Sequence, residues 1–253
     1  MKQWGPRLFA KLAHLLNMVE ETGRWPEGTT EAKAAFLEKD PEDSGNPLAY
    51  RVLLILPGVY RRWAGLRLTQ LADWIDQWAP PEMFAGIRGR GAEDGWLETG
   101  FFMEQAAMEG QDYTAGAVDI MKCFDQLQRP LIYALAKKAG MPDNVLNTYR
   151  VYQEGLTARN AVAGGLGEPY AKPTSIPQGD PLSMAIVGLI MTPWVNMMKA
   201  RGLKPRVLAD DIFLIAKGEE HRANFEQGFE ETQVYPGYGG ETGAEEVAHD
   251  VDL

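Results

Sequence analysis

The stretch Leu208-Ala209-Asp210-Asp211-Ile212-Phe213-Leu214-Ile215 sets two adjacent carboxylates among apolar residues that are typical of a buried strand or hairpin. Moving a carboxylate out of water is costly unless it is paired or binds a metal ion. The pattern therefore predicts that Asp210 and Asp211 meet something cationic. An Asp-Asp pair also suits an ordinary polar hairpin turn, and the segments upstream bear on which interpretation holds.

Two upstream segments carry further polar residues in apolar surroundings. The first is Ala117-Val118-Asp119-Ile120-Met121-Lys122-Cys123-Phe124-Asp125, and the second is Ser175-Ile176-Pro177-Gln178-Gly179-Asp180-Pro181-Leu182-Ser183. Taken in order with Asp210-Asp211, they resemble the palm motifs of reverse transcriptases. The pattern is most similar to that of non-LTR retrotransposons and group II introns.

A related resemblance lies nearer the N-terminus. The segments Phe36 to Lys39, Tyr50 to Trp63 and Phe84 to Gly91 are similar to the fingers segments of the same family. Together the similar segments cover roughly residues 20 to 216, and their specificity lies in their order along the chain. Three positions depart from the family pattern: Val52 replaces Pro, Ser175 replaces Gly, and Leu208 replaces an aromatic residue.

The resemblance implies RNA-templated DNA synthesis, in which a primer 3′-hydroxyl attacks the α-phosphate of a deoxynucleoside triphosphate. Two metal ions about 3.5–4 Å apart stabilise the attacking and leaving oxygens in such reactions. Magnesium, which takes carboxylate oxygens, is the expected ion. The implied catalytic residues and metal ligands are Asp119, Asp210 and Asp211, and the implied partners are an RNA template with a DNA primer.

The resemblance also implies substrate contacts. Phe124 would lie under the incoming sugar and select against a 2′-hydroxyl, while Gln178 and Gly179 would contact the template and the incoming nucleotide. Arg51 and Lys39 would bind the triphosphate, since Arg offers a planar donor fork and Lys a point charge. Each has an ordinary alternative: a core aromatic, a plain turn, or a solvated surface cation.

Two other acids are interpreted as helix caps. Asp180 precedes Pro181, and Asp at the N-cap with Pro at the first helical position is a favoured pair. Asp125 is expected to cap the helix that follows it and not to bind metal.

The order of strand and helix patterns predicts an α+β polymerase fold with fingers and palm, an antiparallel palm sheet packed on helices, and no thumb. We expect a fingers-like part at 1–110, a palm with the catalytic motifs at 111–218, and a truncated palm end with an acidic, disordered tail at 219–253. Helices are expected at 6–22, 60–78, 93–108, 130–138, 143–153, 183–199 and 221–233. Strands are expected at 115–120, 158–163 and 168–173, with a hairpin at 206–216 and a helix or strand at 31–39.

Composition sets further bounds. A chain of 253 residues that is 45% hydrophobic can bury a sizeable core. A single cysteine excludes an intramolecular disulfide and argues against a cysteine-based zinc site, which favours a reduced nuclear or cytoplasmic setting. We expect neither a signal peptide nor a transmembrane segment, and therefore no membrane partner. Protein partners stay open.

Net charge is the main objection to nucleic-acid binding. The formal charge is −10, but ten acidic residues and one Arg lie from Glu219 onward, so the rest of the chain is close to neutral. Residues 51–91 hold six Arg against three acids. They form either a basic patch for nucleic acid or an ordinary solvated helix face.

Two other functions remain open. One is a degenerate retroelement remnant that folds without polymerase activity and binds nucleic acid weakly at most. The other is a different palm-type nucleotidyltransferase, such as an RNA-templated RNA polymerase, which Pro177-Gln178-Gly179 disfavours.

Overall fold

The computed structural model describes residues 5–39, 41–43, 45–46, 49–120, 122–162 and 164–235. The chain divides into two compact units, which we describe separately. Unit 1 comprises Met1–Thr69 and Met141–Pro181, and unit 2 comprises Gln70–Gly140 and Leu182–Leu253. Residues 236–253, which include most of the predicted acidic tail, lie outside the described residues.

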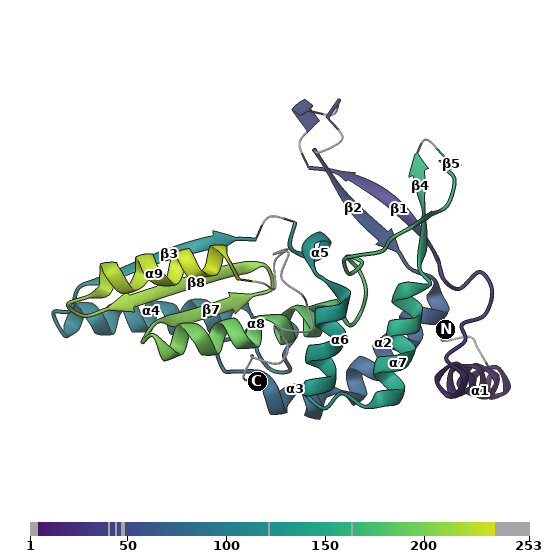
Figure 1. The fold of residues 1–253 in the computed structure, drawn as a ribbon, viewed down its shortest axis with the longest axis horizontal. Helices are drawn as coiled ribbons and strands as arrows, with labels where there is room; N and C mark the ends of the chain where they lie inside the picture. Colours follow the sequence, from purple (N-terminus) through teal and green to yellow (C-terminus); the bar gives the residue numbers. More distant parts are fainter. Residues whose placement is uncertain are drawn as a thin grey trace. The chain divides into compact units, whose positions relative to one another are not determined.

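Unit 1 is built from a mixed sheet and helices that pack beside it (Figure 1). The strands are β1 (Glu31–Glu38), β2 (Tyr50–Ile55), β4 (Thr157–Val162), β5 (Gly165–Leu166) and β6 (Tyr170–Ala171). The helices are α1 (Pro6–Thr22), α2 (Gly58–Gln70), α7 (Asp143–Glu154) and the short 3-10 helix η1 (Pro41–Asp43). Helix α1 packs on α7.

Strand β1 organises the sheet of unit 1. It pairs antiparallel with β2 and parallel with β4, although the paired residues Ala34 and Asn160 are 126 positions apart in the sequence. Ala32 and Ala34 are buried while Glu31 and Lys33, which alternate with them, are exposed, and this is the period-two pattern of a half-buried strand. The segment 31–39, for which helix and strand were both expected, is therefore a strand.

Unit 2 contains the predicted antiparallel sheet, in the order β3-β8-β7. Its strands are β3 (Tyr113–Asp119), β7 (Lys204–Leu208) and β8 (Asp211–Lys217). Its helices are α3 (Ala72–Trp78), α4 (Ala92–Met108), α5 (Cys123–Gln126), α6 (Arg129–Lys138), α8 (Ser183–Ala200) and α9 (His221–Gln233).

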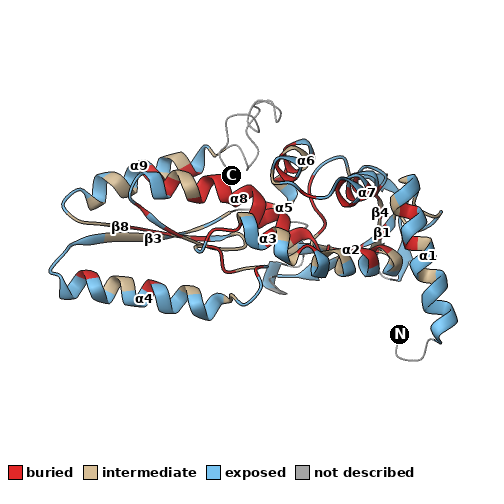
Figure 2. Cartoon of the chain, turned by 90° about the horizontal axis from the view of Figure 1, so that it is seen from below, coloured by how far each residue is buried: buried red, intermediate tan, exposed pale blue. Residues whose placement is uncertain are grey.

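The core of unit 2 lies on one face of this sheet, where α8 and α9 pack. Helix α8 is buried along most of its length (Figure 2). Two hydrogen bonds tie the segment of α9 to α8: the Trp194 indole N–H donates to Thr232 Oγ1 at 3.0 Å, and the Tyr235 hydroxyl donates to the Ile190 carbonyl at 2.8 Å. Gly228 of α9 sits so close to the core that an added Cβ would lie 2.3 Å from Leu203 Cδ1.

Helix α4 lies on the opposite side of the sheet from α9 (Figure 2). It buries only Thr99 and Ala106 among its described residues, and it contacts β7. At its C-terminal end, the ammonium of Lys217 lies 5.1 Å from the Phe102 ring centroid and pairs with Glu109 at 3.3 Å. This face of the sheet is therefore much more open than the face under α8 and α9.

The compact units do not divide at the predicted boundary of residue 110. Residues 70–110 belong with strands β3, β7 and β8 because α4 contacts β7 and the Phe84 N–H donates to the Val207 carbonyl at 2.9 Å. Residues 141–181 belong with the N-terminal part because β4 pairs with β1. The assignment of fingers and palm to parts of the chain remains a prediction.

Three local predictions were wrong. The helix expected at 60–78 is two helices, α2 and α3, that meet at Leu71. Asp180 is not an N-cap residue, because α8 begins at Ser183 with Leu182 at its N-cap, and the Asp180 carboxylate is held by side chains described below. Asp125 lies inside α5, and Gln128 is the N-cap residue of α6.

No helix within the described ranges is both long and apolar enough to cross a membrane.

Close packing at Gly228 yields a stability prediction. Gly228→Ala should lower the free energy of unfolding by about 1–2 kcal/mol, because the methyl group overpacks a site bounded by Leu203, Leu214 and Met198. Gly100→Ala in α4 is the matched control, since a Cβ there meets nothing within 4 Å. It should raise stability by about 0.5–1 kcal/mol through helix propensity alone. Urea unfolding measures both, and equal effects would contradict the packing at α9.

Candidate active site

The hairpin that carries the Asp-Asp pair has a two-residue turn. Leu208 ends β7 and pairs with Asp211 at the start of β8, so Ala209 and Asp210 form the turn. Ala209 has φ of 62°. A positive φ at the first central residue suits the tight turns that match the twist of paired strands, although Gly is the usual residue there.

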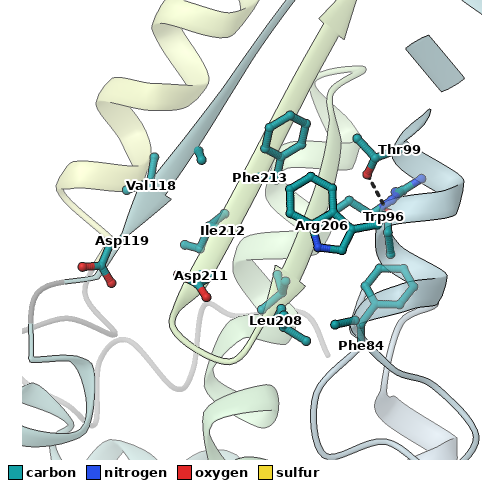
Figure 3. A pocket seen from close by; sticks show the side chains of 14 residues that line it. Phe84, Trp96, Thr99, Val118, Asp119, Arg206, Leu208, Asp211, Ile212 and Phe213 are labelled. Carbon is teal, nitrogen blue, oxygen red and sulfur yellow. Dashed lines mark hydrogen bonds between the residues drawn. The ribbon is translucent and has the colours of Figure 1, made fainter. Parts of the chain in front are cut away.

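Strand β3 brings Asp119 to the same place. Its pairing with β8 sets Asp119 directly opposite Asp211, so both side chains project from the same face of the sheet. Figure 3 shows the two residues at the same end of the neighbouring strands. Both are exposed, and Asp210 is half-buried. The expectation that burial forces these carboxylates to meet a cation was therefore wrong; what remains is the juxtaposition of like charges, which is itself unfavourable.

Asp210 lies close to Asp119, as a backbone hydrogen bond and a shared electrostatic effect on Cys123 show. The Asp210 carbonyl accepts a hydrogen bond from the Ile120 N–H at 3.3 Å, which ties the turn to the residue after Asp119. Burial, and then the negative charges of Asp210 and Asp119, raise the pKa of the Cys123 thiol to about 12. Both carboxylates therefore lie close enough to this buried thiol to act on it. The segment that holds Asp119 and the hairpin that holds Asp210 therefore meet around Cys123.

Metal binding requires more than this juxtaposition. Across the described parts of the chain, no group of three or more His, Cys, Asp or Glu side chains could hold a metal ion as arranged. Asp119 and Asp211 do supply carboxylate oxygens, the donor type that magnesium takes. The donor chemistry therefore fits a divalent ion, and a complete set of protein ligands would need the side chains to converge further.

A cavity of about 470 Å³ lies beside Asp119 and Asp211, between the sheet and α4. Figure 3 shows the side chains that line it. Its walls are mostly apolar, and one cation, Arg206, pairs with Glu98 at 3.2 Å and lies 6.0 Å from the Phe84 ring centroid. Besides the two carboxylates and Arg206, its walls include Phe84, Trp96, Thr99, Leu208 and Phe213. Its volume and its mostly apolar walls are typical of small-molecule sites.

Strained backbone marks all three motifs. Among the residues that the structure describes, three other than glycine have positive φ: Lys122 at 52°, Ser175 at 73° and Ala209 at 62°. One falls in each motif. Positive φ costs a residue with a side chain about 1 kcal/mol or more, and such strain tends to persist at functional sites. Ser175 stands where the family usually has Gly, and its φ explains that preference.

Unit 1 gathers the predicted triphosphate contacts on one sheet face. The register pairs Leu37 with Arg51, and the Lys39 N–H donates to the Ala49 carbonyl at 2.8 Å, which extends the ladder past Leu37. Lys39 and Arg51 are therefore diagonal neighbours on the same face, and both are exposed. Lys33 shares this face. Arg159 lies on it too, because it stands opposite Lys33 in the register of β1 and β4. The sequence analysis did not single out either of these two, since only the pairing of β1 with β4 places them.

The second motif also lies in unit 1, against β2. Gly179 has φ of 100°, and a Cβ there would lie 3.5 Å from the Leu54 carbonyl oxygen and 3.6 Å from Leu53 Cδ1. Gln178 is half-buried and Gly179 is exposed. Leu53 projects from the same sheet face as Arg51, so the Gln178–Gly179 loop approaches the face that carries the two cations.

The remaining predicted contact, Phe124, is a half-buried residue of α5 in unit 2, next to Cys123. The sequence analysis missed the contacts of Tyr60 and Gln153, which bind the carboxylate of Asp180. Tyr60 falls in the fingers-like segment Tyr50 to Trp63, but nothing in the sequence links either residue to a partner 120 or 27 residues away.

Known proteins share this fold. The structure is similar to that of apo telomerase from Candida tropicalis truncated from its C-terminal domain, with a TM-score of 0.62, 12% identity and coverage of 94% of this chain and 56% of that chain. It is also similar to telomerase from Candida albicans in complex with a fragment of telomeric RNA, with a TM-score of 0.60, 12% identity and coverage of 94% of this chain and 46% of that chain. A third similar structure is telomerase from Candida tropicalis in complex with a fragment of telomeric RNA, with a TM-score of 0.61, 9% identity and coverage of 92% of this chain and 43% of that chain. The chain thus spans about half the length of these telomerase chains.

Sequence comparison adds the family. No curated protein sequence gives a significant match. Residues 39–235 match the family described as reverse transcriptase (RNA-dependent DNA polymerase). The closer likeness to non-LTR retrotransposon and group II intron enzymes remains a prediction. Since the match covers well over half of its length, the chain belongs to the reverse transcriptase (RNA-dependent DNA polymerase) family.

Proposed function

We propose that this chain catalyses RNA-templated DNA synthesis by two-metal nucleotidyl transfer. One observation carries the proposal: in a member of the reverse transcriptase family, strand register sets Asp119 opposite Asp211 and beside Asp210. These are the three carboxylates whose motifs match the catalytic acids of the family.

The carboxylates would act as hard oxygen donors. Asp119 and Asp210 would hold both ions, and Asp211 would be a third, more peripheral ligand. Two magnesium ions, when bound, would stabilise the attacking 3′-oxygen and the leaving pyrophosphate oxygen. The uncompensated charge of Asp119 and Asp211 supports this assignment, because a bound cation would offset their repulsion.

The other contacts would bind and orient the substrates. Arg51 and Lys39, diagonal neighbours on one face, would bind the triphosphate of the incoming deoxynucleotide. Gln178 and Gly179, in a loop against β2, would contact the template strand and the nucleotide. The partners would be an RNA template and a DNA primer, and the telomeric RNA in two of the similar structures supports an RNA partner.

The first test is magnesium-dependent extension of a DNA primer on an RNA template. The unmodified chain should extend the primer, and the double variant Asp210→Ala, Asp211→Ala should lose extension by a factor of about 10³ or more. Asp112→Ala is the matched control, because it removes an exposed acid from the same unit outside the motifs. Equal extension by the double variant and by the control would refute the assignment. No extension by any of them would favour the inactive remnant.

Stability separates lost chemistry from lost folding. Asp211→Asn should slow extension yet raise the free energy of unfolding by about 0.2–1 kcal/mol at low ionic strength, since it removes a metal ligand and also like-charge repulsion across the strands. The gain should shrink in about 1 M salt, where charges are screened within about 3 Å. Asp112→Asn changes the net charge equally and should show neither effect. A variant that unfolds more readily would contradict the register of β3 and β8.

Sugar selection tests the proposed role of Phe124. Phe124→Ala should increase the incorporation of ribonucleotides relative to deoxynucleotides by about tenfold or more, because the ring would no longer exclude the 2′-hydroxyl. Competition between the two nucleotide types on one primer and template measures the ratio. An unchanged ratio in an active variant would show that Phe124 is an ordinary packing residue.

A further inference from the structure

The carboxylate of Asp180 is buried at the end of the Gln178–Gly179 loop. Asp180 is 3% exposed. The Tyr60 hydroxyl donates to its Oδ2 at 2.6 Å, and the Gln153 side-chain amide donates to the same oxygen at 2.7 Å. A carboxylate in such a place is tolerated only when donors compensate for the lost water. These two donors therefore fix where the carboxylate sits.

The donors are themselves held rigidly by an aromatic cluster. The Tyr60 ring stacks on Tyr152 with centroids 3.5 Å apart and planes 9° apart. Trp25 meets both rings edge-on, at 5.6 Å from Tyr60 and 5.0 Å from Tyr152. Burial, and then the charge of Asp180, raise the pKa of the Tyr60 hydroxyl well above its usual value. The hydroxyl therefore remains a proton donor throughout the pH range in which proteins work.

The loop is pinned on both sides of its exposed tip. Ser175, Ile176 and Pro177 are buried before it, and Asp180 is buried after it. The Asp180 N–H donates to the Pro177 carbonyl at 3.1 Å, which closes a turn around Gln178 and Gly179. Only these two residues of the turn reach the surface, and Gly179 keeps φ of 100°.

We propose that Tyr60 and Gln153 are positioning residues that act through the Asp180 carboxylate to hold Gln178 and Gly179 in the conformation that meets the template and the incoming nucleotide. The contacts within unit 1 support the positioning of the loop. That the loop contacts the template and the nucleotide rests on the proposed function. Sequence alone interprets Asp180 as a helix cap, whereas the structure gives it the role of an anchor between two helices and the loop.

The stacked pair supplies a matched test. Tyr60→Phe removes the hydroxyl that binds Asp180 and keeps the ring. Tyr152→Phe removes a buried hydroxyl that has no hydrogen-bond partner among the described residues, and it leaves the hydrogen bonds of Tyr60 and Gln153 to Asp180 in place. Hydrogen exchange of the full chain without substrates should show the amides of 178–180 exchanging about tenfold faster in Tyr60→Phe and unchanged in Tyr152→Phe. Amides in β1 and α7 should be unaffected in both.

The kinetic readout separates positioning from general stability. In primer extension, Tyr60→Phe should raise KM for the deoxynucleotide by about tenfold with kcat changed much less, and Tyr152→Phe should leave both unchanged. Gln153→Leu, which removes the hydrogen bond from the Gln153 amide to Asp180, should repeat the Tyr60→Phe pattern in both measurements, and it replaces that variant if Tyr60→Phe fails to fold.

Equal exchange in the two tyrosine variants, or faster exchange throughout unit 1, would overturn the positioning role. If the unmodified chain extends no primer, the proposed function fails, while loop exchange still decides whether Asp180 is held as proposed.

Discussion

The register between β3 and β8 is the constraint on which the position of the carboxylates depends. In an antiparallel pair, a slip in register of one residue turns every side chain of the strand to the opposite face. Packing protects this pair of strands against such a slip. Gly116 leaves room for the Phe225 ring of α9, since a Cβ there would lie 2.7 Å from Phe225 Cζ. A slip of β3 would bring Ala115 or Ala117 to that point, and it would turn Asp119 toward the core. Packing under α9 therefore fixes the position of a carboxylate on the other face.

Backbone strain in the motif segments is concentrated at three residues. Lys122, Ser175 and Ala209 each hold a positive φ without being glycine, and each belongs to one motif segment. Buried neighbours surround two of these segments: Cys123 follows Lys122, and Ile176 and Pro177 follow Ser175. Rigid surroundings of this kind keep a strained backbone from relaxing, and they hold exposed side chains in fixed positions.

Local patterns in the sequence predict much of the fold. Apolar periodicity between Pro6 and Gly23 predicts the helix at 6–22, and the family resemblance implies a helix at 221–233; both have these limits in the structure. The alternating pattern around Asp210 predicts its hairpin, and the α+β class with an antiparallel palm sheet is confirmed. These features depend on neighbours within a few residues, which is the range over which periodicity and capping act.

Features that depend on distant partners could not be predicted in this way. The parallel pairing of β1 with β4 joins segments more than a hundred residues apart. It brings Arg159, which forms an ion pair with Glu31 at 3.0 Å, to the sheet face that carries Lys33, Lys39 and Arg51. Asp180 precedes a proline and therefore matches a cap, but Tyr60 and Gln153 determine its environment. Leu71 divides two helices with neither Pro nor Gly as a signal, and its 3% exposure is visible only in the structure.

Cys123 has a practical consequence for labelling. It is the sole cysteine of the chain, it is 1% exposed, and its thiol stays protonated at neutral pH. Maleimides and similar reagents attack the thiolate of accessible cysteines, so the native thiol offers them little. A cysteine introduced at an exposed position such as Gly100 or Gln105 would carry a fluorophore or spin label selectively, and the native residue beside Asp119 and Asp210 would not need to be replaced.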